Sequence, residues 1–209
     1  ENLINLTDFK TLDYFSENML LFGEGKPQNG LSDRKCRAVD LGYNVEESLP
    51  GLTLYGLIMK DEVVLQTVRK SLESHLKFML PDGAWDNSWG TRNFKWTYWG
   101  SRTSDGSQTA YALLGNRNPV LAEAARRNLE LLEKCTHEGI LHGGLHHYHR
   151  GELPCIHHTF CHSKALATVL DYKDYKQTNF NFWEEQPDIS LPRETNNTEV
   201  TNFNEIDTW

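Results

Sequence analysis

Residues 45–80 read VEESLPGLTLYGLIMKDEVVLQTVRKSLESHLKFML, and this stretch decides the fold. The first half, up to Met59, is mostly apolar, and Pro50 is tolerated only in the first turn of a helix. We therefore predict a helix that starts near Ser48 and is buried on most sides. After Lys60-Asp61, apolar residues recur three and four positions apart, which predicts an amphipathic outer helix over 62–80. These apolar residues are Val64, Leu65, Val68, Leu72, Leu76 and Met79.

The same two patterns return farther along the chain. Pro81-Asp82-Gly83 ends the first pair, and a segment of small and apolar residues over 105–115 predicts the next inner helix. Asn118-Pro119 then opens a second amphipathic helix with a capping residue and a proline. A third apolar helix is predicted at 154–170, opened by Pro154. The repeat of about 50 to 60 residues is what a ring of helical hairpins requires.

This alternation predicts an all-α fold, an (α/α) toroid that is incomplete in this chain. Three inner helices make about half of a ring of roughly six hairpins, and residues 1–40 add at most one more pair. We assign residues 1–175 to the toroid. Residues 176–209 are rich in Asn, Thr, Glu and Pro, and the stretch from 200 to 209 alternates like the start of a strand. This tail is either a linker toward a β-domain or a disordered terminus.

Composition excludes two classes of partner. The net charge of -8 and the pI near 5.6 argue against nucleic acid, because phosphate binding needs clustered Lys and Arg. No run of eighteen apolar residues occurs, so no membrane span is predicted.

The four cysteines show no CxxC spacing, which excludes a zinc ribbon. Six Trp and eight Tyr provide either sugar-stacking surfaces or large core residues.

The long connection over 82–106 is the first candidate for a functional site. It holds four of the six Trp, and loops of this length in compact domains are usually functional. Aromatic platforms beside amide and cationic groups suit an acidic sugar polymer. The other reading is that Trp85, Trp89 and Trp96 fix the loop onto the helices. The predicted substrate-binding residues here are Trp89, Arg92, Trp96, Tyr98 and Trp99.

The second candidate is a histidine cluster. Seven of the nine histidines lie between residues 142 and 162. His142, His146, His147 and His149 lie with Tyr148 and Arg150 in a glycine-rich loop, and His157, His158 and His162 lie at the start of the third inner helix. His158 and His162 share a helix face and could bind a divalent metal such as zinc or calcium, although no HExxH motif is present.

Three segments together resemble the toroid domain of heparinase II/III-like polysaccharide lyases. They are GYNVEESLP at 42–50, DNSWGTR at 86–92 and CIHHTFCH at 155–162, and the resemblance covers roughly residues 40–172. The resemblance implies cleavage of a uronic-acid polysaccharide by β-elimination, a secreted or periplasmic location and a β-sandwich domain beside the toroid. No cofactor is required by such a reaction.

β-Elimination from a uronate has definite chemical needs. The carboxylate must be neutralised before C5 loses its proton, and Asn87 and Arg102 are the candidates for this role. A base must then take the proton, for which His146 or His147 and His158 are the candidates. Tyr148 is the candidate acid or base at the leaving oxygen. Both predicted clusters lie at inner-helix starts, so we expect Asn87 and His158 to meet at one end of the ring.

Two alternatives remain open from the sequence. A glycoside hydrolase on the same ring would use Asp86 with Asp105 or Glu46 as its carboxylate pair, and Glu46 is also a candidate for binding substrate. A non-catalytic module would hold glycan with its Trp residues and keep the histidines for structure or metal. The first alternative consumes water and leaves no unsaturated uronate, whereas the second gives no turnover.

Overall fold

The computed structural model describes residues 15–21, 39, 41–86, 108–154, 156–174, 189–195, 200, 201 and 203. These residues are mostly helical, which confirms the predicted all-α class. The helices are α1 (Leu41–Tyr43), α2 (Leu49–Met59), α3 (Glu62–His75), α4 (Thr109–Leu114), α5 (Pro119–Lys134) and α6 (Ile156–Asp174). Two short strands, β1 (Thr136–His137) and β2 (Ile140–Leu141), pair antiparallel.

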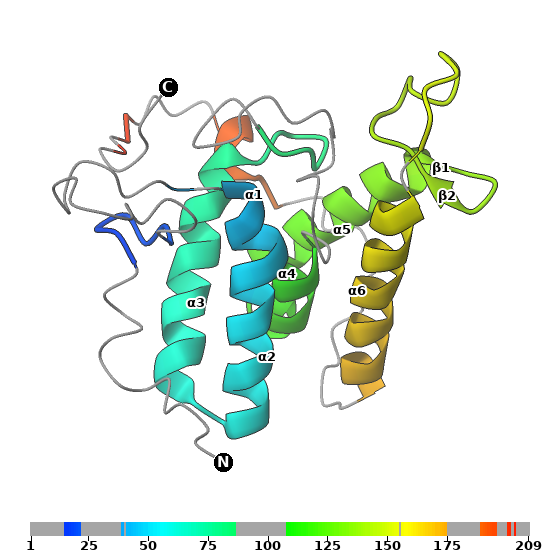
Figure 1. The fold of residues 1–209 in the computed structure, drawn as a ribbon. Helices are drawn as coiled ribbons and strands as arrows, with labels where there is room; N and C mark the ends of the chain where they lie inside the picture. Colours follow the sequence, from blue (N-terminus) through cyan, green and yellow to red (C-terminus); the bar gives the residue numbers. More distant parts are fainter. Residues whose placement is uncertain are drawn as a thin grey trace, which may run out of the picture.

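The long helices are arranged as antiparallel hairpins. α2 and α6 begin at the upper end of the molecule in Figure 1 and run downward, while α3 and α5 run back up. A 3₁₀ turn at Gly115–Arg117 connects α4 to α5, and α4 contacts both α2 and α6. The apolar helices α2 and α6 therefore start at the same end of the molecule, as the sequence pattern predicts.

The turn between α2 and α3 follows from three residues, Lys60, Asp61 and Gly56. Lys60 takes a left-handed conformation with φ 56°, and its N–H donates to the carbonyl of Gly56. Asp61 then caps α3 by accepting from the Val64 N–H at 3.1 Å. Gly56 lets the two helices approach closely, because a Cβ there would lie 2.7 Å from Cδ2 of Leu65.

Helical conformation begins before the predicted start of the first apolar helix. Helical conformation runs from Leu41, and a π-type turn over Asn44–Ser48 joins α1 to α2. In this turn the Leu49 N–H donates to the Asn44 carbonyl, five residues back. Pro50 therefore lies within a longer helical run whose widened turn relaxes the normal hydrogen-bond ladder. The predicted start near Ser48 is confirmed for α2, which has Ser48 as its N-cap, although helical conformation extends back to Leu41.

The first amphipathic helix ends earlier than predicted. α3 stops at His75, a 3₁₀ turn follows at Leu76–Phe78, and Met79 forms an isolated bridge with Trp85. The intervening residues make a tight turn, in which Leu80 N–H donates to the Ala84 carbonyl at 2.8 Å. This local pairing replaces the last helical turn. The predicted helix over 62–80 therefore loses its final residues to the turn.

One hydrophobic core joins the first two hairpins. Tyr111 of α4 is fully buried in it, and its hydroxyl donates to the Leu72 carbonyl of α3 at 3.0 Å. Burial raises the pKa of Tyr111 well above its ordinary value, so the phenol stays protonated and keeps this hydrogen bond. A second, smaller core lies beside Leu131, Leu132 and Cys135 near the end of α5.

Residues 15–21 form a turn rather than a helix. Ser16 N–H donates to the Leu20 carbonyl at 2.8 Å, and Phe15 forms an isolated bridge with Leu21. Leu20 is fully buried, and the Ser71 hydroxyl of α3 donates to the Met19 carbonyl at 2.6 Å. This described part of the first forty residues therefore covers the first hairpin and adds no helix to a ring.

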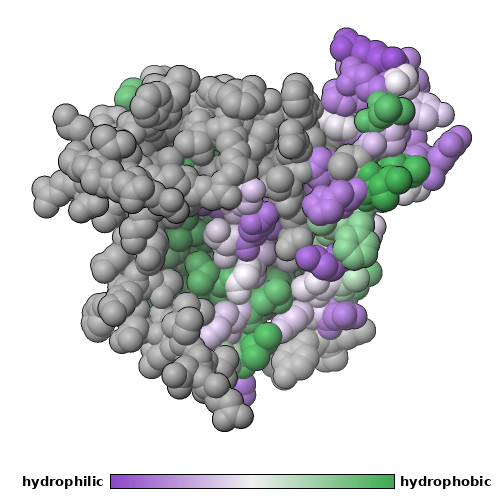
Figure 2. Space-filling model, viewed as in Figure 1, coloured by the Kyte–Doolittle hydropathy of each residue, from purple (hydrophilic) through white to green (hydrophobic). Residues whose placement is uncertain are grey.

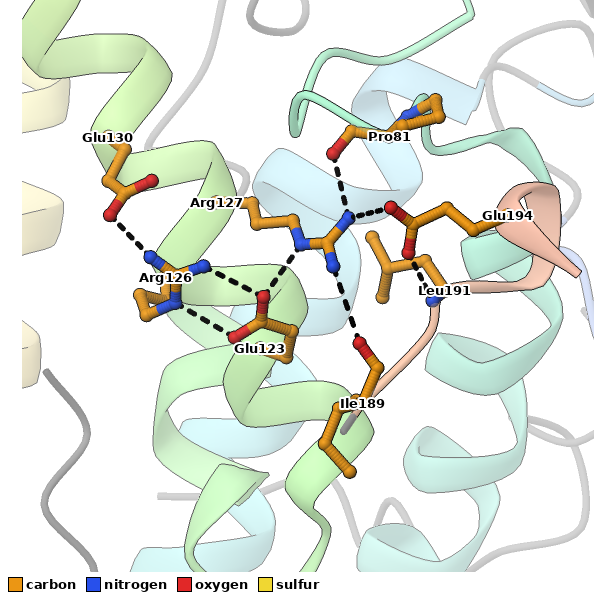
Figure 3. A network of polar contacts seen from close by, with 8 residues as sticks. All are labelled: Pro81, Glu123, Arg126, Arg127, Glu130, Ile189, Leu191 and Glu194. Atoms are coloured by element: carbon orange, nitrogen blue, oxygen red, sulfur yellow. Dashed lines mark hydrogen bonds and ion pairs between the residues drawn. The ribbon is translucent and has the colours of Figure 1, made fainter. Parts of the chain in front are cut away.

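The segment 189–195 packs against α5 instead of extending from the helices. Leu191 is fully buried, and Figure 3 shows Arg127 of α5 holding this segment through Glu194 and the Ile189 carbonyl. Arg127 Nη1 donates to Glu194 Oε1 at 2.6 Å and to the Pro81 carbonyl at 2.8 Å. One guanidinium thus joins the tail, α5 and the turn after α3. The division of the chain at residue 175 stays a prediction.

Glu123 of α5 belongs to the same network of polar contacts. Its side chain is 2% exposed, and it accepts from Arg126 Nη2 at 2.8 Å and from Arg127 Nε at 2.7 Å. Burial alone raises the pKa of Glu123, but the hydrogen bonds and charges of the two arginines together lower it below the ordinary value. The hydrogen bond from Arg127 is the main cause that lowers the pKa of Glu194.

We expect Glu194→Gln to lower the melting temperature at neutral pH and to lose this effect in acid. A carboxylate whose pKa is lowered by folding stabilises the fold above its ordinary pKa of 4.5, and this stability disappears as pH falls through the lowered value. The wild type and the variant should differ by about 2 °C at pH 7 and converge near about pH 3. Thermal melts across this range measure the difference.

Glu62→Gln is the matched control for that experiment. Glu62 is 66% exposed on its side chain and lies 4.0 Å from Arg69, so its ion pair is worth little. An equal loss of melting temperature in both variants would contradict a specific role for Glu194.

No helix among the described residues combines the length and hydropathy needed to cross a bilayer.

Candidate functional site

Contacts with the core hold the first residues of the Trp-rich connection in place. Trp85 is 6% exposed and its ring lies 5.7 Å from the ring of Tyr111, so Trp85 fills the core, as one reading of this loop predicted. Asp86 N–H donates to the Phe78 carbonyl at 2.8 Å. The rest of the connection, 87–106, lies outside the described residues, as does Ser107. The predicted site residues that fall there are Asn87, Trp89, Arg92, Trp96, Tyr98, Trp99 and Arg102.

Asp86 forms an ion pair that bears on the hydrolase alternative. Its Oδ2 lies 2.8 Å from Nη2 of Arg193 in the C-terminal segment. A carboxylate held by a guanidinium is a poor proton donor, whereas hydrolysis needs one protonated carboxyl group. The alternative partner Asp105 lies outside the described residues, so this pair stays a prediction.

Glu46 lies in the π-type turn at the start of α2 and is fully buried. Turns of this kind occur often at functional sites, and this one sits at the end where the apolar helices begin. The predicted role of Glu46 in binding substrate stays a prediction.

Asn44 of the same turn is held by a buried histidine. His75 Nδ1 lies 2.7 Å from the Ser71 carbonyl, so this nitrogen carries the proton and Nε2 accepts from Asn44 Nδ2 at 3.1 Å. Burial lowers the pKa of His75 to about 4, which keeps the ring neutral at pH 7. Because the unfolded chain takes up this proton first, His75 costs stability as pH falls from about 6.5 toward 4.

The histidine-rich loop forms an aromatic cluster beyond the end of α5. Tyr148 stacks on His137 with ring centroids 4.2 Å apart and planes 14° apart. His142 and His149 present ring edges to Tyr148 at 5.3 and 5.5 Å. Tyr148 is 40% exposed, so this predicted acid or base is accessible to a ligand.

His146 and His147 lie apart from that cluster. His146 is exposed, and His147 Nδ1 lies 3.4 Å from Glu152 Oε2. The structure therefore groups Tyr148 with His142 and His149 rather than with the two predicted bases. The roles of His146 and His147 in proton transfer stay predictions.

His158 and His162 occupy the buried face of α6, one helical turn apart. They are 6% and 3% exposed, and the loop with Tyr148 is tied to this helix by the Leu141 N–H, which donates to Thr159 Oγ1 at 3.0 Å. Among the described residues, no third His, Cys, Asp or Glu lies where it would complete a metal site with these two. The metal assignment to this pair stays a prediction.

The expected meeting of Asn87 with His158 at one sugar also stays a prediction, because Asn87 is not described. The turn that leads to Asn87 does lie at the upper end in Figure 1, where α6 begins. The two connections therefore approach the same end of the helical hairpins.

A family model for the ulvan lyase N-terminal domain matches residues 5–187. The chain belongs to this family. It is also similar to a broad-specificity ulvan lyase of Formosa agariphila, with 50% identity over 200 residues. That match covers 93% of this chain and 30% of the relative, so this ulvan lyase N-terminal domain spans less than a third of that enzyme. No solved structure matches the chain.

Sequence reasoning missed His137, which supports Tyr148 in this domain. Its signal was the two-residue connection Glu138-Gly139 between β1 and β2. Both residues take positive φ, 52° and 77°, as a type I′ hairpin turn requires. This turn sets His137 opposite Ile140 and brings it back beside the histidine-rich loop.

Proposed function

We propose that this chain is the helical part of a polysaccharide lyase that cleaves ulvan, a uronic-acid-containing glycan, by β-elimination. The observation that carries the proposal is the family match over residues 5–187, together with 50% identity to a broad-specificity ulvan lyase. The wealth of His and Tyr beside the helix starts supports the same chemistry, because elimination needs a base and an acid rather than two carboxyl groups.

The proposed roles follow the requirements of the reaction. Asn87 and Arg102 neutralise the uronate carboxylate, and one of the candidate bases His146, His147 or His158 takes the C5 proton. Tyr148 serves the leaving oxygen. Its exposed phenol beside three imidazoles supports this role, since proton transfer needs a group that substrate can reach.

The proposed glycan surface is the Trp-rich connection. Trp89, Trp96, Tyr98 and Trp99 would stack on sugar rings, and Arg92 would pair with a carboxylate. Glu46 is a further candidate for binding substrate. The proposed partner is therefore an acidic polysaccharide, and neither nucleic acid nor a membrane is expected to take part.

We further propose that the hairpins form part of an (α/α) toroid like that of heparinase II/III-like lyases. α2 is apolar on all sides, yet Ile58 and Met59 are exposed, as are Ile156 and Phe160 on α6. Figure 2 shows apolar surface over α2 and around the start of α6. Further helices of a ring would cover such surfaces. An adjoining β-sandwich and a secreted or periplasmic location complete this proposal.

The test is the product released from ulvan by the purified protein. A lyase leaves a conjugated unsaturated uronate that absorbs in the ultraviolet, and one such end should form for each bond broken. New reducing ends without this absorbance would favour the hydrolase, and binding without either would favour the non-catalytic module.

Chelation tests the proposed cofactor independence. No cofactor is required for β-elimination, so we expect activity to persist in a chelator. Loss of activity that zinc or calcium restores would instead assign a metal, with His158 and His162 as the first ligands to replace.

A further inference from the structure

Two buried side-chain amides, those of Asn128 and Gln108, differ in whether they have a hydrogen-bond partner. Asn128 of α5 is fully buried, and its Nδ2 donates to the Gly83 carbonyl at 2.8 Å. Gln108 is 2% exposed, and neither its amide nitrogen nor its amide oxygen has a hydrogen-bond partner in the part of the chain that the structure describes. A buried polar group without a partner destabilises the fold, so buried amides of this kind are rare and call for an explanation.

The position of Gln108 suggests the explanation. It directly follows the Trp-rich connection and precedes α4, with its carbonyl accepting from the Ala112 N–H at 2.8 Å. Gln108 and Tyr111 lie three residues apart and so share a face of this helical turn. Trp85, at the other end of the connection, packs on Tyr111.

Trp85 carries a second buried group of this kind. Its indole Nε1 has no hydrogen-bond partner among the described residues, although the side chain is only 6% exposed. Both ends of the Trp-rich connection therefore hold buried N–H donors that find no acceptor among the described residues. An acidic ligand supplies acceptors, and a buried donor interacts with a carboxylate more strongly than an exposed one does.

We propose that the Gln108 amide contacts the substrate and donates to the uronate carboxylate. This inference rests on the proposed function and adds to it a residue for neutralising the carboxylate. As C5 loses its proton, negative charge grows on the carboxylate oxygens. A fixed N–H donor therefore stabilises the transition state more than it stabilises the bound ground state. The amide oxygen remains available to accept from a sugar hydroxyl.

Gln108→Met separates this role from a structural one. Met matches the length of Gln and removes both polar atoms, so a side chain without protein partners should leave the melting temperature unchanged or raise it. We expect KM on ulvan to rise about tenfold and kcat to fall about tenfold, because the amide contacts the carboxylate in the bound ground state and stabilises it further in the transition state.

Asn128→Leu is the matched control, because it removes a buried amide that has a protein partner. We expect a lower melting temperature for this variant, opposite in sign to Gln108→Met. A fall in melting temperature for Gln108→Met of the same size as for Asn128→Leu would overturn the proposal, as would a kcat within twofold of the wild type.

A binding measurement keeps this inference distinct from the proposed reaction. If the wild type releases no unsaturated product, the proposed function fails, and titration of ulvan oligosaccharides then tests Gln108 alone. At least tenfold weaker binding by Gln108→Met supports the contact. Equal binding by the two proteins, or no binding by the wild type, overturns it.

Discussion

Gly83→Ala is expected to destabilise this domain by about 4 kcal/mol, because a methyl group has no space at this position. A Cβ on Gly83 would lie 2.4 Å from the carbonyl carbon of Arg127 and 2.5 Å from the nitrogen of Asn128. Both are backbone atoms of α5 and cannot rotate away as a side chain does. The turn after α3 and the helix α5 would have to separate.

The backbone conformation adds a second cost. Gly83 has φ 85°, a region that residues with a Cβ rarely adopt. Its carbonyl also accepts from Asn128 Nδ2, so displacement of the turn would break this buried hydrogen bond. Chemical denaturation gives the free energy of unfolding, and a lower midpoint at unchanged slope is the expected result.

Gly139→Ala separates the two costs. Gly139 has φ 77° in the β1–β2 turn, but a Cβ there meets nothing within 4 Å. We expect this variant to lose only about 1 kcal/mol from backbone strain. Equal losses in the two variants would show that strain alone acts at Gly83 and that the approach of α5 contributes nothing.

The helical hairpins could be predicted because their signals are local. Apolar spacing in 62–80, the cap and proline at Asn118-Pro119 and the breaks at 81–83 fix the alternation of helices whatever the rest of the chain does. The π-type turn at Asn44–Ser48 could not be predicted in this way. It depends on contacts with other segments, such as the bonds from Asn44 to His75 and to the Leu21 carbonyl.

The site was predicted less completely, because its residues meet through folding. Histidine density alone indicated the 142–162 region, but only the hairpin turn brings His137 under Tyr148. The prediction that His158 and His162 share a helix face is confirmed, because both side chains are buried one turn apart on α6. The packing of the 189–195 segment on α5 could not be predicted from local sequence, because it depends on a hydrogen bond between Arg127 and Glu194, which are 67 residues apart.

Tyr148→Phe is expected to lower kcat/KM on ulvan at least 100-fold without changing the melting temperature. The phenol oxygen is the proposed proton carrier at the leaving oxygen, and general acid or base catalysis contributes about 100-fold or more. The ring that stacks on His137 remains in the variant, so the loop keeps its packing. Initial rates of unsaturated product, with melts of the same samples, measure both effects.

Tyr55→Phe controls for the loss of a hydroxyl group as such. Tyr55 lies on α2 and is partly buried against the core, away from the proposed chemistry, so its rate should stay at the wild-type level. Wild-type kcat/KM in Tyr148→Phe would remove this residue from the mechanism.

His158→Ala extends the test from one residue to the pair. If Tyr148 and His158 act on the same sugar in one elimination, either change alone removes most of the catalysis, and the double variant should be scarcely slower than the worse single one. Losses that multiply would instead mean that the two residues act independently. Tyr148 lies on the loop beyond α5 and His158 lies on the buried face of α6. The double variant therefore tests whether both side chains act on the same bound sugar.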